Sequence, residues 1–314
     1  MVYLEAFSKV LPVILLFILG AFLRRTRFLS ESTVGDLKKL IVNISLPAVL
    51  FLAFAGVHLE GRHLVIVAIV FVACLLALLL GRLIGPPLGL KSPYFPTLMT
   101  GFEAGMMGYA IFGAVYGAQQ IFNFAVVDLG QVVFVFFILV PFVQRISSGA
   151  TSFGATLRGF LKTPVIIAIF LGIVANRLGV LPVLQGWPVS AAVVRTVELL
   201  GALTMPLIAL VIGYEVRLQR GNLLKPAEAI ALRLLVWVPV GLLVNALVVR
   251  PLFGTVPVLE AAVLTMFVLP PPFVIPLFMA EPEGADRTFV VNTLSLATLV
   301  TLVAFTVITV VYRP

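Results

Sequence analysis

Charge is scarce in this chain of 314 residues: charged residues make up 11% of it and hydrophobic residues 61%. Soluble domains have about 25% charged and roughly 45 to 50% apolar residues. So little charge excludes an ordinary soluble globular protein. The composition predicts an all-α membrane protein with several spans and the lipid bilayer as its surroundings.

Cysteine, histidine and catalytic motifs are scarce as well. The single cysteine, Cys74, excludes an intrachain disulfide, and the chain has only two histidines. No nucleophile-and-base motif and no nucleotide-binding loop is recognisable in the sequence. We therefore expect neither an enzyme nor an ATP-driven pump, and we expect no metal site and no cofactor.

Uncharged runs recur along the whole chain, and crossing a bilayer as a helix takes about 20 residues. Some runs reach that length alone, and others need a charged residue near the membrane boundary. We predict ten spans joined by short connections: residues 4–23, 37–57, 63–85, 95–115, 123–143, 163–179, 194–215, 230–250, 258–279 and 288–311.

Basic residues are distributed unevenly between these connections. Fifteen of the 21 lysines and arginines are counted with the odd-numbered connections, among them Arg233 near the start of the eighth span. Positive residues mark cytoplasmic loops, so both termini are predicted to lie outside the cytoplasmic (inner) membrane. The net charge of +8 follows from this topology and does not indicate nucleic-acid binding.

The chain divides into two sets of five spans. Residues 1–143 form the first set, 144–163 form a polar cytoplasmic connecting loop, and 164–314 form the second set. An odd number of spans in each half predicts an inverted repeat. Pro47 and Pro206 fall in the second span of each half, where they either interrupt the helix for function or are ordinary transmembrane kinks.

The fourth span of each half contains helix-breaking residues. Gly105 and Gly108 lie in a glycine-rich stretch of the fourth span, and Pro270, Pro271 and Pro272 interrupt the ninth. The glycines could equally serve close helix packing, but no continuous helix passes through three consecutive prolines. Non-helical backbone at membrane depth is typical of transporter substrate sites, so we predict broken helices four and nine.

Several motifs together resemble the auxin efflux carrier family. LPVILLFILGAFLRRTRFLSE resembles its first span, and LIVNISLPAVLF its asparagine and proline signature, carried here by Asn43 and Pro47. LGALTMPLIALVIGYEV is similar to the seventh span, and VVDLGQVVFVF to the fifth span of bacterial members. The resemblance covers nearly the whole chain.

This resemblance implies the fold of the bile acid and auxin transporter superfamily, with ten spans in two inverted repeats and crossing broken helices four and nine. It also implies transport of small organic anions by an elevator movement, and a possible homodimer. The sequence departs from the family at the crossover. Glu103 stands where asparagine is usual, and Ala110 stands where proline is usual.

Glu103 is the strongest candidate for ion coupling, because an ionisable side chain inside a span is costly and is by default a functional hypothesis. It could bind a proton or stay ionised beside a cation such as sodium; the alternative is a structural carboxyl bonded to the broken backbone. Asp128 and Gln131 lie one turn apart in the fifth span. Asp128 could pair with Glu103, hold sodium, or cap a neighbouring helix.

Free backbone amides after the proline break suit a substrate carboxylate, since the second half-helix should start near Phe273 and Val274. The candidate substrate-binding residues are Asn43, Glu103, Gly105, Gly108, Gln131, Pro271, Pro272, Phe273 and Val274. We predict an ion-coupled secondary transporter of small organic anions. The alternatives are a cation/proton antiporter that uses Glu103 and Asp128, and a non-transporting membrane sensor.

Overall fold

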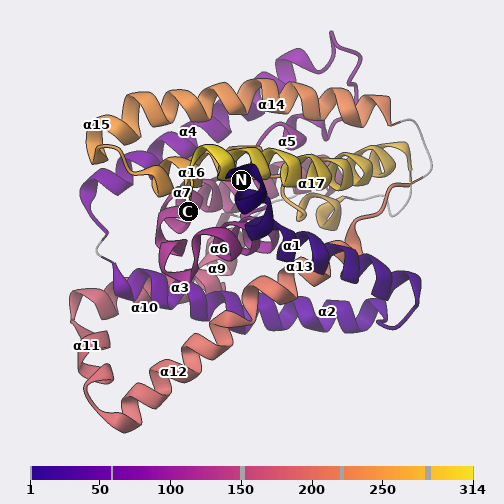
Figure 1. Ribbon diagram of the computed structural model, residues 1–314. Helices are drawn as coiled ribbons and strands as arrows, with labels where there is room; N and C mark the ends of the chain where they lie inside the picture. Colours follow the sequence, from indigo (N-terminus) through magenta and orange to yellow (C-terminus); the bar gives the residue numbers. More distant parts are fainter. Residues whose placement is uncertain (1, 58, 149–152, 220–222, 280–283, 314) are drawn as a thin grey trace.

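The protein is helical throughout the part that the structure describes. The computed structural model describes residues 2–57, 59–148, 153–219, 223–279 and 284–313, and these contain no strand (Figure 1). The α-helices are α1 (Val2–Arg25), α2 (Glu31–Leu40), α3 (Leu46–Gly56), α4 (Gly61–Ile84), α5 (Phe95–Leu98), α6 (Tyr109–Tyr116), α7 (Ile121–Phe134), α8 (Val140–Ser148), α9 (Phe153–Leu161), α10 (Pro164–Arg177), α11 (Val180–Gln185), α12 (Pro188–Ala202), α13 (Thr204–Glu215), α14 (Leu224–Val244), α15 (Arg250–Phe253), α16 (Pro257–Val268) and α17 (Ala285–Val311).

Short turns of other geometry join some of these helices into longer rods. The π-helical turns are Ile41–Ser45, Ala104–Gly108, Val135–Leu139 and Asn245–Val249, and the 3-10 turns are Ala118–Gln120 and Ile275–Phe278. As a result α2 runs into α3, α7 into α8, and α14 into α15.

Six of these rods are long and apolar enough to cross a membrane, among the described residues: Glu31–Gly56, Gly61–Ile84, Ala118–Ser147, Pro188–Glu215, Leu224–Phe253 and Ala285–Val311. Three shorter apolar helical stretches accompany them: Ala104–Tyr116, Pro164–Arg177 and Pro257–Val268. Large apolar side chains such as Leu83 and Val303 are 73% and 69% exposed, which suits contact with lipid. A multi-pass, all-α membrane protein is therefore confirmed.

The predicted connecting loop, residues 144–163, is helical over much of its length. Residues 144–148 end α8 and residues 153–161 form α9, while 149–152 lie outside the described residues. The ring of Phe160 packs on Phe136 and Phe137 at centroid distances of 5.3 and 5.0 Å, and this contact holds α9 against the preceding span.

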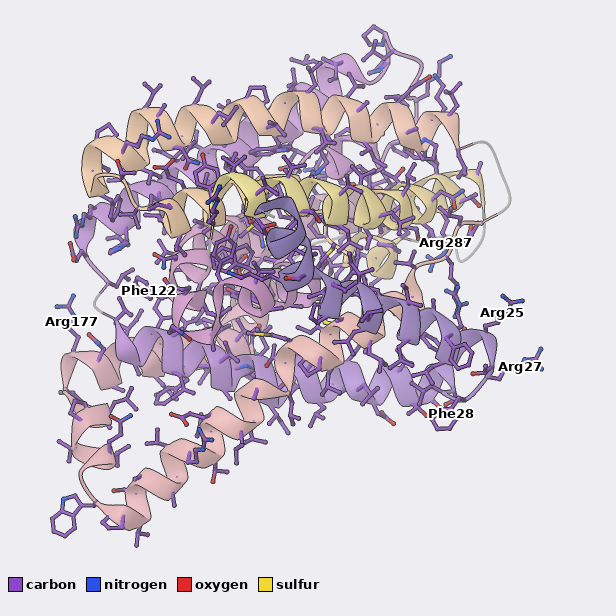
Figure 2. All side chains as sticks on the ribbon, viewed as in Figure 1. Arg25, Arg27, Phe28, Phe122, Arg177 and Arg287 are labelled. Carbon is purple, nitrogen blue, oxygen red and sulfur yellow. The ribbon has the colours of Figure 1, made fainter. Side chains whose placement is uncertain are left out.

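Helices far apart in the sequence pack in pairs. Figure 1 shows α2 and α3 along one side of the molecule, α14 along the other, and α6, α7 and α16 between them. Within the first side α1 packs on α13 and α3 packs on α10, whereas α14 packs on α16 and α17. The charged side chains Arg25, Arg27 and Arg287 lie toward one end of the molecule and Arg177 toward the opposite end (Figure 2).

Glycines let the paired helices touch backbone to backbone. A Cβ on Gly213 would lie 2.1 Å from the Phe17 carbonyl oxygen, and one on Gly20 would lie 2.1 Å from the Leu210 oxygen. Small residues permit this approach between membrane helices. The contact between α1 and α13 therefore depends on the absence of a side chain at both positions.

Replacing Gly213 with alanine is expected to destabilise the protein by about 1 to 3 kcal/mol, because the added methyl group must push two backbones apart. Thermal unfolding in detergent measures the effect as a lower midpoint. Gly35→Ala is the matched control, since a Cβ there meets nothing within 4 Å. Equal midpoints for the two variants would contradict the close packing of α1 on α13.

Candidate functional site

Two helical segments break, one at the predicted prolines and one just before the predicted glycines, since Gly105 and Gly108 lie in the π-helical turn Ala104–Gly108 that follows the first break. After α5 the chain is not helical through residues 99–103, and after α16 it is not helical through 269–272. Gly101 has φ +65°, which glycine adopts readily. Leu269 is extended, with φ −62° and ψ 153°, as expected for a residue before proline. Local chemistry thus accounts for both breaks.

The two breaks cross in direct contact. The Glu103 N–H donates to the Pro270 carbonyl oxygen at 2.9 Å. A Cβ on Gly101 would lie 2.8 Å from Pro272 Cγ, so a larger residue would separate the two segments. Residues that are 167 positions apart in the chain therefore form one small centre.

Glu103 joins the two breaks through its side chain. Its Oε1 accepts a hydrogen bond from the Met106 N–H at 2.9 Å, and its Oε2 accepts one from the Phe273 N–H at 2.5 Å. The residue is 8% exposed. The first bond caps the helical stretch that runs into α6, and the second satisfies an amide just beyond the prolines. The carboxyl group therefore occupies the Phe273 amide, one of those that the sequence analysis assigned to a substrate carboxylate.

The second half of the ninth span differs from the expected α half-helix. Phe273 and Val274 lie in a turn, and the following helix is a single 3-10 turn, Ile275–Phe278. Pro276 lies in the first turn, where proline is tolerated because its missing N–H would have no helical partner, so this proline does not explain the 3-10 geometry. The N-terminal dipole at this site therefore comes from the stretch leading into α6, together with the lone Phe273 amide.

Asp128 and Gln131 form a second buried polar group beside the break. Both are 4% exposed. Gln131 Nε2 donates to Asp128 Oδ1 at 2.7 Å, and the Tyr109 hydroxyl donates to Oδ2 at 2.7 Å. Gln131 Oε1 accepts from the Phe102 N–H at 3.3 Å. Asp128 therefore reaches the crossover through Gln131 and Phe102, and its carboxyl oxygens are bonded to Gln131 and Tyr109, not to Glu103.

Arg233, on α14, lies at the centre of the crossover. Its Nη1 donates to the Leu98 oxygen at 2.9 Å, and its Nη2 donates to the oxygens of Gly101 and Leu269 at 2.5 and 3.2 Å. The guanidinium carbon lies 4.8 Å from the Phe102 ring centroid, and the residue is 2% exposed. One cation thus binds carbonyls that both breaks leave without helical partners.

The sequence analysis counted Arg233 with a cytoplasmic connection although it lies inside the predicted eighth span, and that count was wrong because the residue is buried at the crossover. When only the local sequence is considered, a basic residue close to a span boundary is assigned to the adjoining loop. A signal was present: Trp237 follows Arg233 by one turn on the same face, and its Nε1 donates to the Met99 oxygen at 2.8 Å. The sequence analysis also did not identify Tyr109 as a partner of Asp128. A single tyrosine in the apolar fourth span gives little indication of such a role.

Asn43 is not part of this centre. Its side chain is exposed, and Nδ2 donates to the Lys39 carbonyl oxygen at 2.7 Å within the same helix. Asn43 lies at the middle of the π-helical turn Ile41–Ser45. Pro47 lies directly after the π-helical turn, inside the continuous helical rod Glu31–Gly56, and Pro206 lies in the first turn of α13.

The two candidate glycines differ in their surroundings. A Cβ on Gly108 would lie 2.3 Å from Phe124 Cζ, so this glycine permits close packing of the fourth and fifth spans. The nearest group to a Cβ on Gly105 is Glu103 Oε1 at 4.0 Å. Gly105 therefore faces the carboxyl group and leaves room beside it.

A cavity of about 210 Å³ adjoins the crossover. Phe273 lines it, and its amide is the donor to Glu103. Lys38 and Glu215 also line it and form an ion pair with each other. The cavity is large enough only for a small molecule, and Lys38 is the one basic side chain that lines it among the described residues.

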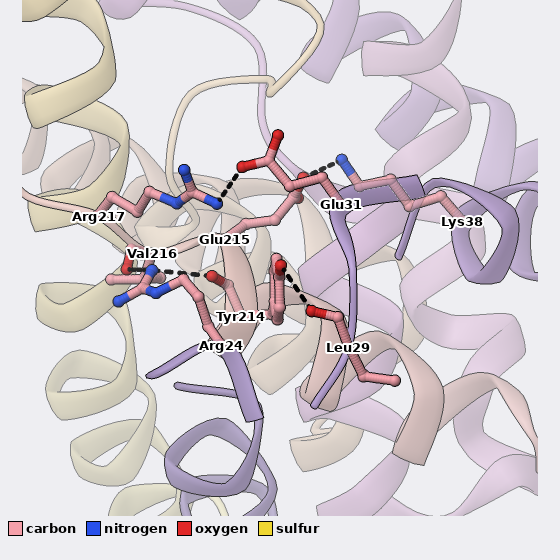
Figure 3. A network of polar contacts seen from close by, with 8 residues as sticks. All are labelled: Arg24, Leu29, Glu31, Lys38, Tyr214, Glu215, Val216 and Arg217. Atoms are coloured by element: carbon pink, nitrogen blue, oxygen red, sulfur yellow. Dashed lines mark hydrogen bonds and ion pairs between the residues drawn. The ribbon is translucent and has the colours of Figure 1, made fainter. Parts of the chain in front are cut away.

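A polar network adjoins this cavity and shares Lys38, Glu215 and Val216 with its lining (Figure 3). Arg24 donates to the carbonyl oxygens of Tyr214 and Val216 at 2.8 and 2.6 Å, and Arg217 pairs with Glu31 at 2.8 Å. Ser295 on α17 accepts from the Arg217 N–H and donates to the Arg217 oxygen. The turn between α1 and α2 is thus tied to the end of α13, which in turn is tied to α17.

No family model matches this sequence, and a comparison with curated proteins finds no similar one. The described residues contain no group of three histidine, cysteine or acidic side chains placed to hold a metal ion. The functional argument therefore rests on the geometry of the crossover.

Proposed function

We propose that this chain is a secondary transporter that carries small organic anions across the cytoplasmic membrane. The observation that carries the proposal is the buried carboxyl group of Glu103, which bridges two broken helices beside a cavity of about 210 Å³. Broken helices at membrane depth form substrate and ion sites in many transporters. An ionisable group placed there is by default functional.

The packing supports ten spans arranged as two inverted repeats. The first span of one half, α1, packs on α13, in the second span of the other half. Reciprocally, α10 packs on α3. Such an exchange of equivalent partners is expected when two halves are related by a pseudo-two-fold axis. Gly20 and Gly172 show the same exchange at single residues. A Cβ added to either glycine would lie within 3 Å of backbone atoms in the opposite half.

Glu103 supplies a coupling mechanism in this proposal. While ionised, its carboxylate holds the amides of Met106 and Phe273 and excludes an external carboxylate from them. When a proton binds, the neutral group holds these amides less strongly, because bonds to charged acceptors are the stronger ones. A substrate carboxylate entering past Lys38 then replaces it. One proton would accompany each substrate carboxylate that binds in this way.

The proton is a better fit than sodium as the coupling ion. Both carboxyl oxygens of Asp128 already accept hydrogen bonds from Gln131 and Tyr109. A cation at that carboxyl group would face two donor hydrogens, whereas sodium and other hard cations prefer oxygen ligands. Asp128 in this proposal positions Gln131 and hence the broken segment at Phe102.

An elevator movement is compatible with the arrangement of helices. The crossover, α14 and α17 would move as one group against a scaffold built from α1, α3, α10 and α13. The polar network at Lys38, Glu215 and Arg217 lies where these groups meet, so it would open and close with each cycle.

A cation/proton antiporter is the second candidate. It is favoured by one observation: Glu103 already fills the amides that an anion would use. A carboxyl group that stays bound there could exchange protons for cations without any organic anion.

Transport in liposomes separates the two candidates. We expect purified protein in liposomes to accumulate some members of a panel of mono- and dicarboxylates and indole-type acids when an inward proton gradient is applied. Dissipating the gradient should reduce accumulation to equilibration. Protein-free liposomes and Glu198→Gln, which alters an exposed ion pair on α12, serve as controls. Proton exchange with cations and no uptake of any acid would overturn the anion proposal in favour of the antiporter.

A further inference from the structure

A second cavity, of about 390 Å³, lies between the end of α4, residues 85–96 and α8. Three basic side chains line it: Arg82, Lys91 and Arg145. They come from three separate places in the chain, and no acidic side chain lines the cavity among the described residues.

These three cations lack the acidic partners that many other basic residues have. Lys38, Arg217 and Lys225 each form an ion pair, whereas Arg82, Lys91 and Arg145 form none with any described residue. The Arg82 guanidinium instead lies over the Phe142 ring, 5.1 Å from its centroid. Three uncompensated positive charges around one hollow create a potential that attracts an anion.

Close packing of α4 on α5 shapes the floor of this cavity. A Cβ on Gly81 would lie 2.9 Å from Pro96 Cα, and one on Gly85 would lie 2.7 Å from Phe95 Cδ1. The rest of the lining includes the apolar side chains of Leu90, Phe142 and Ile146. The cavity thus combines a charged rim with apolar walls, which suits an amphiphile better than a small polar solute.

An apolar stripe on α4 leads away from Arg82. Leu79, one turn before it on the same face, is 46% exposed, and the adjacent Leu83 is 73% exposed. Both belong to a helix long and apolar enough to span the membrane. A molecule with its charged group among the three cations could therefore lay hydrocarbon chains along this helix.

We propose that this cavity binds the phosphate headgroup of an acidic phospholipid from the cytoplasmic leaflet, held by Arg82, Lys91 and Arg145. Basic pockets between membrane helices on the cytoplasmic side bind such headgroups. The general excess of positive residues in cytoplasmic loops accounts for the sign of these charges. This general excess does not explain why the three basic side chains line one cavity next to exposed apolar side chains of α4.

The test uses delipidated full-length protein in neutral detergent, titrated with phosphatidylglycerol or phosphatidylcholine and followed by native mass spectrometry. We expect phosphatidylglycerol to bind at least about tenfold more tightly than phosphatidylcholine, given the contribution of each basic residue near an anionic headgroup. The triple variant Arg82→Gln, Lys91→Gln, Arg145→Gln should lose this preference.

A matched control replaces three other basic residues, Arg25, Arg27 and Arg158, with glutamine. All three are exposed and lie outside the cavity, and Arg25 and Arg27 project away from the molecule (Figure 2). Both triple variants have the same net charge, so the non-specific attraction between the protein and anionic lipid decreases equally in the two variants. Retention of the preference by the cavity variant, or its equal loss in both variants, would overturn the proposal.

Wild-type protein alone provides a second test that does not depend on folding of a variant. Glycerophosphoglycerol carries the same headgroup phosphate without acyl chains. We expect it to compete for the site only at concentrations about a hundredfold higher than the lipid, because the chains contribute apolar contact with α4. Equal competition would identify a site for soluble phosphate compounds and overturn the assignment to lipid.

Discussion

Replacing Glu103 with alanine is expected to turn the crossover into a site that small carboxylates bind from solution. The variant loses the acceptor for the amides of Met106 and Phe273. Losing two charge-assisted hydrogen bonds should cost about 3 kcal/mol or more of stability. Formate or acetate can then enter the vacated space and accept the same two bonds. Carboxylate should therefore raise the unfolding midpoint of the variant, and saturation at about 100 times Kd corresponds to roughly 2.7 kcal/mol.

The wild-type protein should respond weakly to the same carboxylates at neutral pH, because Glu103 occupies the amides. Its response should grow as the pH falls, since a protonated Glu103 is the form that can leave. The Glu103→Ala variant has no such group, so its response should not grow in this way. Chloride at equal ionic strength is the control for general salt effects, and Glu198→Ala is the control for removal of an exposed carboxyl group.

Glu103→Gln tests coupling in transport. Glutamine can accept one amide hydrogen bond, but its NH₂ group faces the other amide, donor to donor. It also cannot take up a proton. Proton-driven accumulation should fall by about a hundredfold or more, while downhill exchange of the same acid continues. Unchanged accumulation would show that Glu103 is only a structural carboxyl group.

The proline break could be predicted from the sequence because its cause is local, whereas the break in the fourth span lies at residues 99–103, before the predicted Gly105 and Gly108. Three consecutive prolines exclude a helix in any surroundings, and glycine at φ +65° is a property of one residue. The position of Glu103 was likewise readable, since a lone carboxyl group in an apolar run is unusual wherever it lies. Its role was less accessible, because the Phe273 amide that it binds lies 170 residues away.

Asn43 and Arg233 show where local reading fails. Asn43 was proposed from a motif, yet it lies in a π-helical turn and its side chain bonds to the Lys39 carbonyl oxygen of the same helical rod. Such turns depend on how a helix packs and leave little trace in composition. Arg233 was assigned by distance from a span boundary, although the carbonyls it binds lie 132 and 135 residues earlier and 36 residues later. Contacts over such separations are set by the tertiary fold.

Arg233→Met is expected to be the most destabilising single substitution at the crossover. Methionine has similar length and suits an apolar helix, but it cannot donate to the carbonyls of Leu98, Gly101 and Leu269. Each would remain buried without its donor. Unsatisfied buried groups cost about 1 to 3 kcal/mol each, so a loss of about 3 kcal/mol or more follows. Thermal unfolding in detergent should show a large decrease in midpoint.

Arg233→Lys separates charge from geometry. A lysine retains the positive charge, but its single ammonium group cannot reach three carbonyls arranged around a planar guanidinium. We expect this variant to fold, with a midpoint between those of the wild type and Arg233→Met, and to transport more slowly because the two breaks are held less firmly. Arg195→Met is the control, since Arg195 forms an exposed ion pair with Glu198 on α12.

A wild-type midpoint in Arg233→Lys would mean that charge alone stabilises the crossover and that the guanidinium geometry is unimportant. An unchanged midpoint in Arg233→Met would mean that Arg233 does not stabilise the crossover at all. Neither result is expected, because the broken segments have lost helical partners for these carbonyls and the membrane interior offers no water to replace them. A cation fixed on α14 is the means by which this sequence keeps two non-helical segments in contact at membrane depth.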